Sequence, residues 1–144
     1  PAVGGGAVAE RSVTLDELAH EAWAVWRSAP PGAVVWLVGE MGSGKTTFAQ
    51  AITRAAGAAP ARSPTYALVH EYASAEGPIV HADCYRLRHP DEALDLDFPA
   101  LLARARLLLV EWPERAGIHA PEPDIQVRLR HAAAAELRML ERVP

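Results

Sequence analysis

A glycine-rich segment between two regular-looking runs constrains this chain more than any other feature. Residues 39–47 read Gly-Glu-Met-Gly-Ser-Gly-Lys-Thr-Thr, which matches G-x-x-x-x-G-K-[ST], the P-loop pattern. Residues 33–38 before it are apolar and rich in β-formers, and residues 45–56 suit a helix. Strand, loop and helix in this order let backbone N–H groups and a helix N-terminus surround a phosphate. The segment therefore predicts a nucleotide-binding α/β protein.

Within this segment, the side chains that follow the last glycine predict more than binding. Lys45 is expected to bridge the β- and γ-phosphates and assist catalysis, and the Thr46 hydroxyl to hold Mg²⁺. Lys45 is also the only lysine among 14 basic residues, so the composition avoids lysine except here. The predicted nucleotide-binding residues of the segment are Gly39, Met41, Gly42, Ser43, Gly44, Lys45, Thr46 and Thr47.

Length and charge narrow the class of protein. A chain of 144 residues predicts one domain, here residues 12–144, after a flexible lead-in over residues 1–11. Its net charge of −4 argues against a broad nucleic-acid-binding surface. The single cysteine, Cys84, excludes a disulfide framework. With no apolar run near the roughly 18 residues of a membrane span, we expect a cytoplasmic protein.

Periodicity predicts the remaining elements. Thr14 and Glu17 form a capping-box pattern before a helical repeat, and Ala132–Glu141 suits either a helix or the return strand of a hairpin. Strands at 66–72 and 79–85 are expected to pair as an antiparallel hairpin. The expected helices cover 15–28, a short piece opening at 90, and 100–105; further strands cover 106–112 and 125–129.

Two of the expected strands end in an acid. Leu107 to Val110 are apolar and lead into Glu111, and Ile79 to Ala82 lead more loosely into Asp83. A carboxylate near the P-loop is what hydrolysis requires, since Mg²⁺ must be held there. Either acid could hold the metal, directly or through water, while the other orients the attacking water.

Other residues near these acids leave two interpretations open. Thr65, in Ser-Pro-Thr-Tyr at 63–66, is either a switch residue that reaches Mg²⁺ or part of a plain proline turn. Trp112 packs either on a nucleotide or in the core. The chain contains no asparagine, so the N-K-x-D element that reads guanine is absent from it and ATP is favoured.

Together these segments resemble the TsaE (YjeE) family of small P-loop ATPases. The resemblance rests on residues 39–47, the Ser-Pro-Thr-Tyr at 63–66, Asp-Cys-Tyr-Arg-Leu at 83–87 and Glu-Trp-Pro at 111–113. It covers residues 12–144. It implies a mixed β-sheet flanked by helices, with antiparallel hairpins and a C-terminal strand. It also implies an ATPase that acts with TsaD-like and TsaB-like proteins in threonylcarbamoyladenosine modification of tRNA.

The resemblance also implies roles for individual residues. Thr46 and Glu111 would be Mg²⁺ ligands, and Thr65 and Asp83 would be needed for hydrolysis. Trp112 would lie near the nucleotide. Thr14 matches an adenine-side contact, and Arg138 lies near a late arginine that faces the phosphates.

Two other functions fit a short P-loop chain. A small-molecule kinase would carry an Arg-rich lid, but the candidate segment at 84–99 is short and acidic after Arg88. A non-hydrolysing nucleotide-sensing module would need Lys45 but not Glu111. The expected ATPase is slow alone, because no arginine finger stands out. A direct contact with tRNA is expected to be absent or weak.

Overall fold

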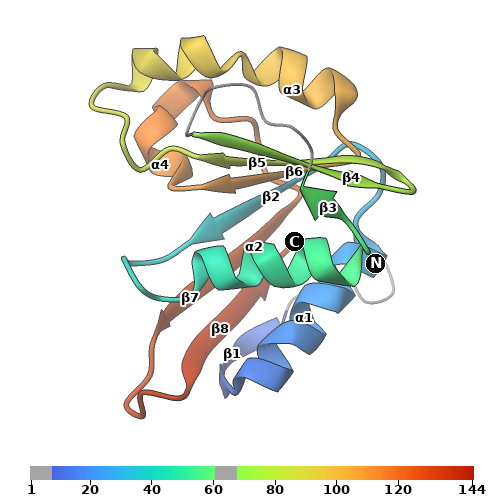
Figure 1. Ribbon diagram of the computed structural model, residues 1–144. Helices are drawn as coiled ribbons and strands as arrows, with labels where there is room; N and C mark the ends of the chain where they lie inside the picture. Colours follow the sequence, from blue (N-terminus) through green and yellow to red (C-terminus); the bar gives the residue numbers. More distant parts are fainter. Residues whose placement is uncertain (1–7, 61–67) are drawn as a thin grey trace.

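A mixed sheet forms the centre of the molecule in this computed structural model (Figure 1). The structure describes residues 8–60 and 68–144, and within them the eight strands lie in the order β1-β8-β7-β2-β6-β5-β4-β3. β2 pairs in parallel with β6 and β7, and β6 pairs in parallel with β5, whereas the outer pairs are antiparallel. The strands are β1 (Val8–Val13), β2 (Ala33–Val38), β3 (Ala59–Pro60), β4 (Val69–Ser74), β5 (Gly77–Asp83), β6 (Leu107–Glu111), β7 (Ile125–His131) and β8 (Arg138–Val143).

Helices cover both faces of the sheet. α1 and α2 lie on one side of it and α3 and α4 on the other (Figure 1). Among the described residues, none of the helices has the length and apolar character needed to cross a membrane. The helical segments are α1 (Leu15–Ser28), α2 (Lys45–Ala55), η1 (Pro90–Leu96), α3 (Phe98–Arg104), α4 (Pro113–Ala116) and η2 (Gly117–His119), of which η1 and η2 are 3₁₀ helices.

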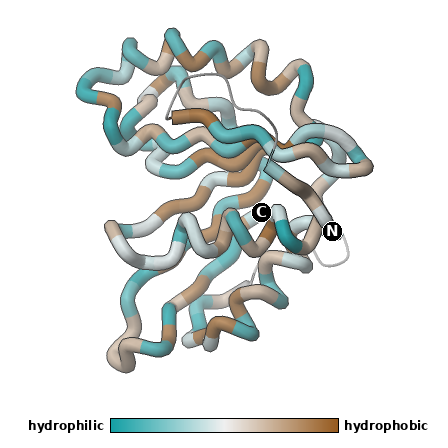
Figure 2. Tube along the Cα trace, in the orientation of Figure 1, coloured by the Kyte–Doolittle hydropathy of each residue, from teal (hydrophilic) through white to brown (hydrophobic). Residues whose placement is uncertain are grey.

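The two faces of the sheet have separate cores. Phe48 and Ile52 of α2 pack with Leu109 on one face, and Phe98 of α3 packs with Val110 on the other. Figure 2 shows the hydrophobic stretches of the trace concentrated along the central strands. All five residues of β6 are buried, as expected for a strand covered on both faces.

The parallel register brings the ends of three strands together. Leu37 of β2 and Asp83 of β5 are both paired with Glu111 of β6. The carboxyl ends of these strands, and the P-loop that follows β2, therefore lie at one edge of the sheet. Ligands of open α/β sheets bind at this edge.

Most predicted elements are confirmed. α1 spans Leu15–Ser28 as expected, and its capping box forms: Glu17 N donates to Thr14 Oγ1 (3.2 Å) and Thr14 N to Glu17 Oε1 (2.9 Å). The hairpin expected from strands at 66–72 and 79–85 is β4–β5, with His70 paired with His81; its strands are shifted to Val69–Ser74 and Gly77–Asp83, and residues 66 and 67 lie outside the described part of the chain. The fold class, a mixed sheet with flanking helices, is confirmed as well.

The two ends of the described chain form a pair of strands that pattern reading did not resolve. The expected lead-in over residues 1–11 is wrong for residues 8–11, which belong to β1. β1 pairs antiparallel with β8, and Glu10 bonds Arg130 at 2.6 Å. The segment left open at 132–141 supplies β8 from Arg138 onward, because a turn returns the chain beside β7. The short β3 and α4 were not predicted.

Candidate functional site

The P-loop joins β2 to α2 through glycines that the local backbone requires. Gly42 and Gly44 have φ of 76° and 110°, a region that side chains disfavour. Gly44 is also the N-cap of α2. At Gly39, an added Cβ would collide with the Leu129 carbonyl oxygen and with Ser43 Oγ. The loop therefore turns tightly against β7. It leads directly into the first turn of α2, where the backbone N–H groups are free of helical partners.

Lys45 is held inside this loop. Its side chain is buried, and Nζ donates to the carbonyl oxygens of Gly39 (2.5 Å) and Glu40 (2.7 Å). Burial lowers the pKa of Lys45 below its ordinary value, although the nearby carboxylates of Glu111 and Asp83 oppose that shift. Ser43 is fully buried too, and its Oγ has no hydrogen-bond partner within the described part of the chain.

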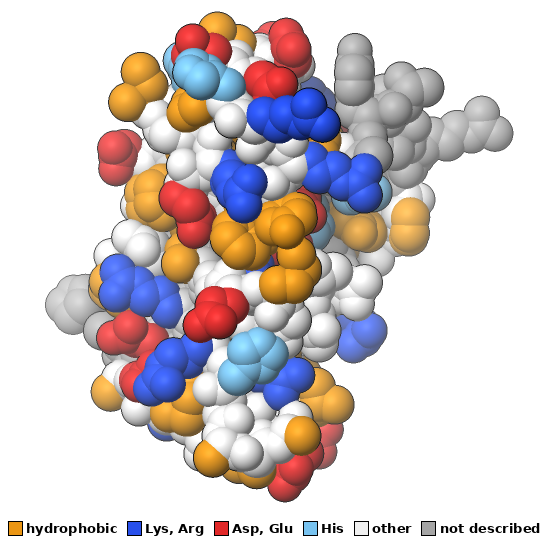
Figure 3. All heavy atoms as spheres, turned by 90° about the vertical axis from the view of Figure 1, so that its left-hand side faces the viewer, with side chains coloured by type: hydrophobic (Ala, Val, Ile, Leu, Met, Phe, Trp, Pro, Cys, Tyr) orange, Lys and Arg blue, Asp and Glu red, His pale blue; other side chains and the backbone are white. Residues whose placement is uncertain are grey.

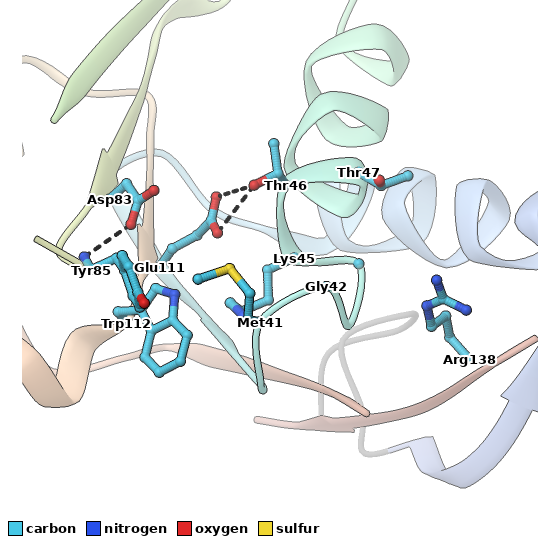
Figure 4. A pocket seen from close by; sticks show the side chains of 11 residues that line it. Met41, Gly42, Lys45, Thr46, Thr47, Asp83, Tyr85, Glu111, Trp112 and Arg138 are labelled. Carbon is cyan, nitrogen blue, oxygen red and sulfur yellow. Dashed lines mark hydrogen bonds between the residues drawn. The ribbon is translucent and has the colours of Figure 1, made fainter. Parts of the chain in front are cut away.

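The acids at the strand ends meet the first turn of α2. Thr46 Oγ1 donates to Glu111, at 3.1 Å from Oε2 and 3.3 Å from Oε1. His81 Nε2 lies 2.6 Å from the same Oε2. Asp83, which ends β5 beside Glu111 of β6, accepts a hydrogen bond from Tyr85 N at 3.0 Å. Figure 4 shows Asp83 and Glu111 side by side, with Glu111 facing Thr46.

Glu111 is ionised in spite of its burial. Loss of solvent is the largest influence on its pKa and raises it, but the His81 contact, the Thr46 hydrogen bond and the Lys45 charge together outweigh that influence. The pKa of Glu111 therefore lies below its ordinary value. A buried carboxylate that stays charged can serve a cation.

An aromatic wall stands on the other side of Lys45. Trp112 adopts a left-handed conformation (φ 55°), which is rare for a bulky side chain and occurs mostly where function requires it. Its ring lies 4.5 Å from Lys45 Nζ and 5.0 Å from the ring of Tyr85. The guanidinium of Arg115 covers Tyr85 at 5.0 Å. Figure 3 views the molecule from the left-hand side of Figure 1 and shows hydrophobic side chains grouped near the centre, with charged side chains around them.

These groups enclose two adjoining cavities. The first, about 240 Å³, is lined by Met41, Gly42, Gly44, Lys45, Thr46, Thr47, Asp83, Tyr85, Glu111, Trp112 and Arg138. The second, about 160 Å³, shares Gly44, Thr47 and Arg138 with it and is otherwise lined mainly by the start of α1, including Thr14 and Leu18. Figure 4 places Arg138 across the loop from Glu111, and Arg138 lines both cavities.

The structure thus brings nearly all predicted site residues together. Gly39 and Ser43 lie within the loop itself, and Thr14 lies in the second cavity. Thr65, with the rest of its Ser-Pro-Thr-Tyr segment, lies outside the described residues. That these residues bind a nucleotide or a metal stays a prediction.

Comparison with known proteins places the chain. A family model described as "Threonylcarbamoyl adenosine biosynthesis protein TsaE" matches residues 12–140. The chain belongs to the TsaE family. The resemblance inferred from the sequence motifs is confirmed.

Relatives and one solved structure agree with this membership. The tRNA threonylcarbamoyladenosine biosynthesis protein TsaE of Haemophilus influenzae is 36% identical over 97 residues, which are 67% of this chain and 61% of that protein. The Bacillus subtilis protein of the same name is 32% identical over 109 residues, 75% of this chain and 68% of that protein. The match to the first relative thus spans about three fifths of its length. The crystal structure of Bacillus subtilis YdiB has a TM-score of 0.71 at 24% identity, covering 95% of this chain and 85% of that one, which shows a shared fold.

Sequence reasoning on this TsaE-family chain missed three residues at the site. His81 contacts Glu111, the Tyr85 ring packs at a tilt of 54° against Trp112, and His131 Nε2 contacts the Met41 carbonyl oxygen at 3.1 Å. His81 could have been found, because strand alternation puts it on the same face as Asp83, two residues later. No local pattern signals the contact of His131, which depends on how β7 lies against the loop.

Proposed function

We propose that this chain is a Mg²⁺-dependent ATPase that supports formation of the threonylcarbamoyladenosine modification of tRNA. One observation carries the proposal: the hydrogen bond of 3.1 Å between Thr46, at the start of the P-loop helix, and Glu111, at the end of β6. It joins a phosphate-binding loop to an ionised acid on a neighbouring strand, as P-loop hydrolases require. Membership of the TsaE family supports the tRNA pathway.

Lys45 and the loop backbone are the groups that we assign to the phosphates. The ammonium of Lys45 now donates to the carbonyls of Gly39 and Glu40. Phosphate oxygens are stronger acceptors than carbonyls because they carry charge, so we expect Lys45 to exchange those contacts for the nucleotide. The N–H groups at Gly42, Gly44 and the first turn of α2 complete the cradle.

Thr46 and Glu111 are assigned to Mg²⁺, which when bound neutralises charge on the β- and γ-phosphates. Thr46 directs its hydroxyl hydrogen at Glu111, so the lone pairs of its oxygen remain available to a cation. Within the described chain there is no cluster of three or more His, Cys, Asp or Glu suited to a metal. That fits Mg²⁺, which is usually held by one or two carboxylates together with substrate phosphates.

Asp83 and Thr65 are assigned to hydrolysis. Asp83 lies next to Glu111 in the register of β5 and β6, at the wall of the same cavity. It can therefore accept a hydrogen bond from an attacking water and orient it. Thr65 is proposed as a switch residue from its motif alone.

The second cavity is the part of the site that we assign to the nucleoside. Thr14 and Leu18 offer a hydroxyl and an apolar surface, and Arg138 lies between this cavity and the first. An apolar pocket with a few polar groups suits an adenine base. Trp112 is proposed to pack near the nucleotide at the opposite wall.

The proposal includes protein partners. We propose that the chain acts with TsaD-like and TsaB-like proteins in the cytoplasm, and that its hydrolysis is slow without them. Its net charge of −4 favours protein contacts over a strong direct contact with tRNA.

Hydrolysis and binding are tested together with two variants. We expect Lys45→Ala to weaken binding of a non-hydrolysable ATP analogue by about 10- to 100-fold, because a charge-assisted contact is lost. Glu111→Gln should keep binding of the analogue in the absence of Mg²⁺ but slow phosphate release by roughly 10- to 100-fold. Calorimetry and phosphate release, with and without the partners, measure these effects. Unchanged turnover by Glu111→Gln would remove Glu111 from the metal site, and phosphate transfer to an added metabolite would favour a kinase.

A further inference from the structure

His81 is a buried histidine in direct contact with the acid of the site. Its Nε2 lies 2.6 Å from Glu111 Oε2, and the side chains are only 7% and 4% exposed. β5 and β6 are parallel, and His81 and Glu111 project onto the same face of the sheet, toward α2. The contact is therefore built into the sheet rather than formed by two mobile surface groups.

The direction of this hydrogen bond follows from the charge of Glu111. An ionised carboxylate can only accept hydrogen bonds, so Nε2 of His81 must carry the hydrogen and donate it. Thr46 Oγ1 donates to the same Oε2 at 3.1 Å and more weakly to Oε1 at 3.3 Å. His81 thus restrains one oxygen of the carboxylate and leaves the other with lone pairs to spare.

We propose that His81 is a positioning residue that fixes the carboxylate of Glu111 for the metal held with Thr46. The proposal rests on the function proposed above, in which Thr46 and Glu111 serve Mg²⁺. A hydrogen bond from a neighbouring group that orients a metal-site side chain commonly changes metal affinity or activity by about 10- to 100-fold. His81 is absent from the lining of the first cavity and acts in this proposal only through Glu111.

The alternative is that His81 only fills the core. Its neighbours on this face of the sheet, Ile79, Leu107 and Leu109, are fully buried and apolar. An apolar residue at 81 would continue that core, and burying a hydrogen-bonded polar pair in place of apolar groups seldom improves stability. On this face β5 changes from apolar Ile79 to polar His81 and Asp83 as it approaches Glu111, which favours the positioning role.

A polar cavity on the α2 side of Glu111 strengthens the argument. This cavity, about 220 Å³, is lined by Thr46, Gln50, His70, Tyr72, His81, Asp83 and Glu111. It shares Thr46, Asp83 and Glu111 with the first cavity. Without His81, the carboxylate of Glu111 would have room in this cavity to leave its position against Thr46 Oγ1.

The test measures how strongly Mg²⁺ and nucleotide assist each other's binding. A non-hydrolysable ATP analogue is titrated by calorimetry into the full chain, once with Mg²⁺ and once with a chelator, and the ratio of the two affinities is taken. We expect His81→Leu to lower this ratio by about 10- to 100-fold, leaving affinity in chelator within about twofold. His81→Gln retains a donor and should recover most of the ratio. His70→Leu, on the paired strand, is the matched control and should keep it.

A double variant separates positioning from packing. If His81 acts through Glu111, then His81→Leu should change the ratio little in a Glu111→Gln background. The proposal would be overturned if the two substitutions lowered the affinity ratio independently, so that the double variant showed the product of the two effects. It would also be overturned if His81→Gln melted like the wild type but did not restore the ratio. If the wild-type ratio is already about one, the Mg²⁺ site itself fails. If the wild type depends on Mg²⁺ and His81→Leu is the same, only the role of His81 fails.

Discussion

Gly39 is the position in the P-loop where an added side chain would collide most severely with its neighbours. It lies where the P-loop leaves β2, and the loop passes so close to β7 that a Cβ would overlap the Leu129 carbonyl oxygen. Close approach of backbone, rather than flexibility, is therefore the reason for glycine here. The same packing brings the backbone of Gly39 against Ser43, and the Gly39 carbonyl oxygen accepts a hydrogen bond from Lys45 Nζ.

We expect Gly39→Ala to lower the free energy of unfolding by about 1–3 kcal/mol, because the added methyl group forces the loop and β7 apart. Nucleotide affinity should fall with it. Gly32→Ala is the control: Gly32 has φ 84° but no atom within 4 Å of an added Cβ, so only backbone strain is expected and affinity should be retained. Chemical denaturation and calorimetry measure both quantities. Wild-type affinity in Gly39→Ala would contradict the close approach.

The lowered pKa of Glu111 predicts how the free energy of unfolding varies with pH in acid. Its pKa in the folded protein lies below its ordinary value, so its ionised form stabilises the fold. That contribution is complete above the ordinary pKa of a glutamate and is lost as pH falls through the lowered pKa. Glu111→Gln should therefore show a shallower loss of unfolding free energy below about pH 5 than the wild type.

Denaturant titrations at several pH values test this expectation for Glu111. Glu10→Gln is a useful comparison, because Glu10 also has a lowered pKa, owing to its hydrogen bond with Arg130, but lies exposed at the surface. Its removal should change the acid slope less than removal of Glu111, since solvent screens an exposed pair. Equal slopes for the wild type and Glu111→Gln would contradict the account.

At the scale of elements, α1 and α2 border the site with their N-terminal ends. α2 starts at the P-loop, and α1 starts at Thr14, which both caps the helix and lines the second cavity. Glu17 completes the same capping box but is absent from the cavity lining. The pair therefore offers a way to separate helix stability from ligand binding.

We expect Thr14→Ala and Glu17→Ala each to lower the free energy of unfolding by about 0.5–1 kcal/mol, because each removes one arm of the capping box. Only Thr14→Ala should also weaken binding of the ATP analogue, whereas Thr14→Ser should preserve both properties. Thermal melts and calorimetry provide the comparison. Equal affinity losses in Thr14→Ala and Glu17→Ala would mean that the helix, and not the hydroxyl, matters to the nucleoside.

At the scale of the molecule, what could be predicted follows from the range of the interactions involved. α1, the strand–loop–helix at β2 and α2, and the β4–β5 hairpin are encoded by local periodicity, caps and turns, and the sequence predicted them. The pairing of β1 with β8 could not be read locally, since it joins residues from opposite ends of the chain, such as Val8 with Arg142.

The site divides in the same way. The P-loop motif and the acids at strand ends predicted Lys45, Thr46, Asp83 and Glu111 as neighbours, because parallel strands end at one edge of a sheet. The contact of His81 with Glu111 needs the register of β5 against β6, and the left-handed backbone of Trp112 has no signature in its own sequence. Geometry across strands was therefore the missing information.

The proposed ATPase function in tRNA modification is tested most directly by reconstituting the modification reaction. The reconstitution combines tRNA, a supply of threonylcarbamoyl-adenylate, the TsaD-like and TsaB-like proteins and ATP with either the wild-type chain or Lys45→Ala, and it quantifies modified adenosine over many turnovers. We expect only the wild-type chain to sustain turnover, because Lys45 is proposed to be needed for binding ATP. Equal yields with both chains, or with neither added, would contradict it.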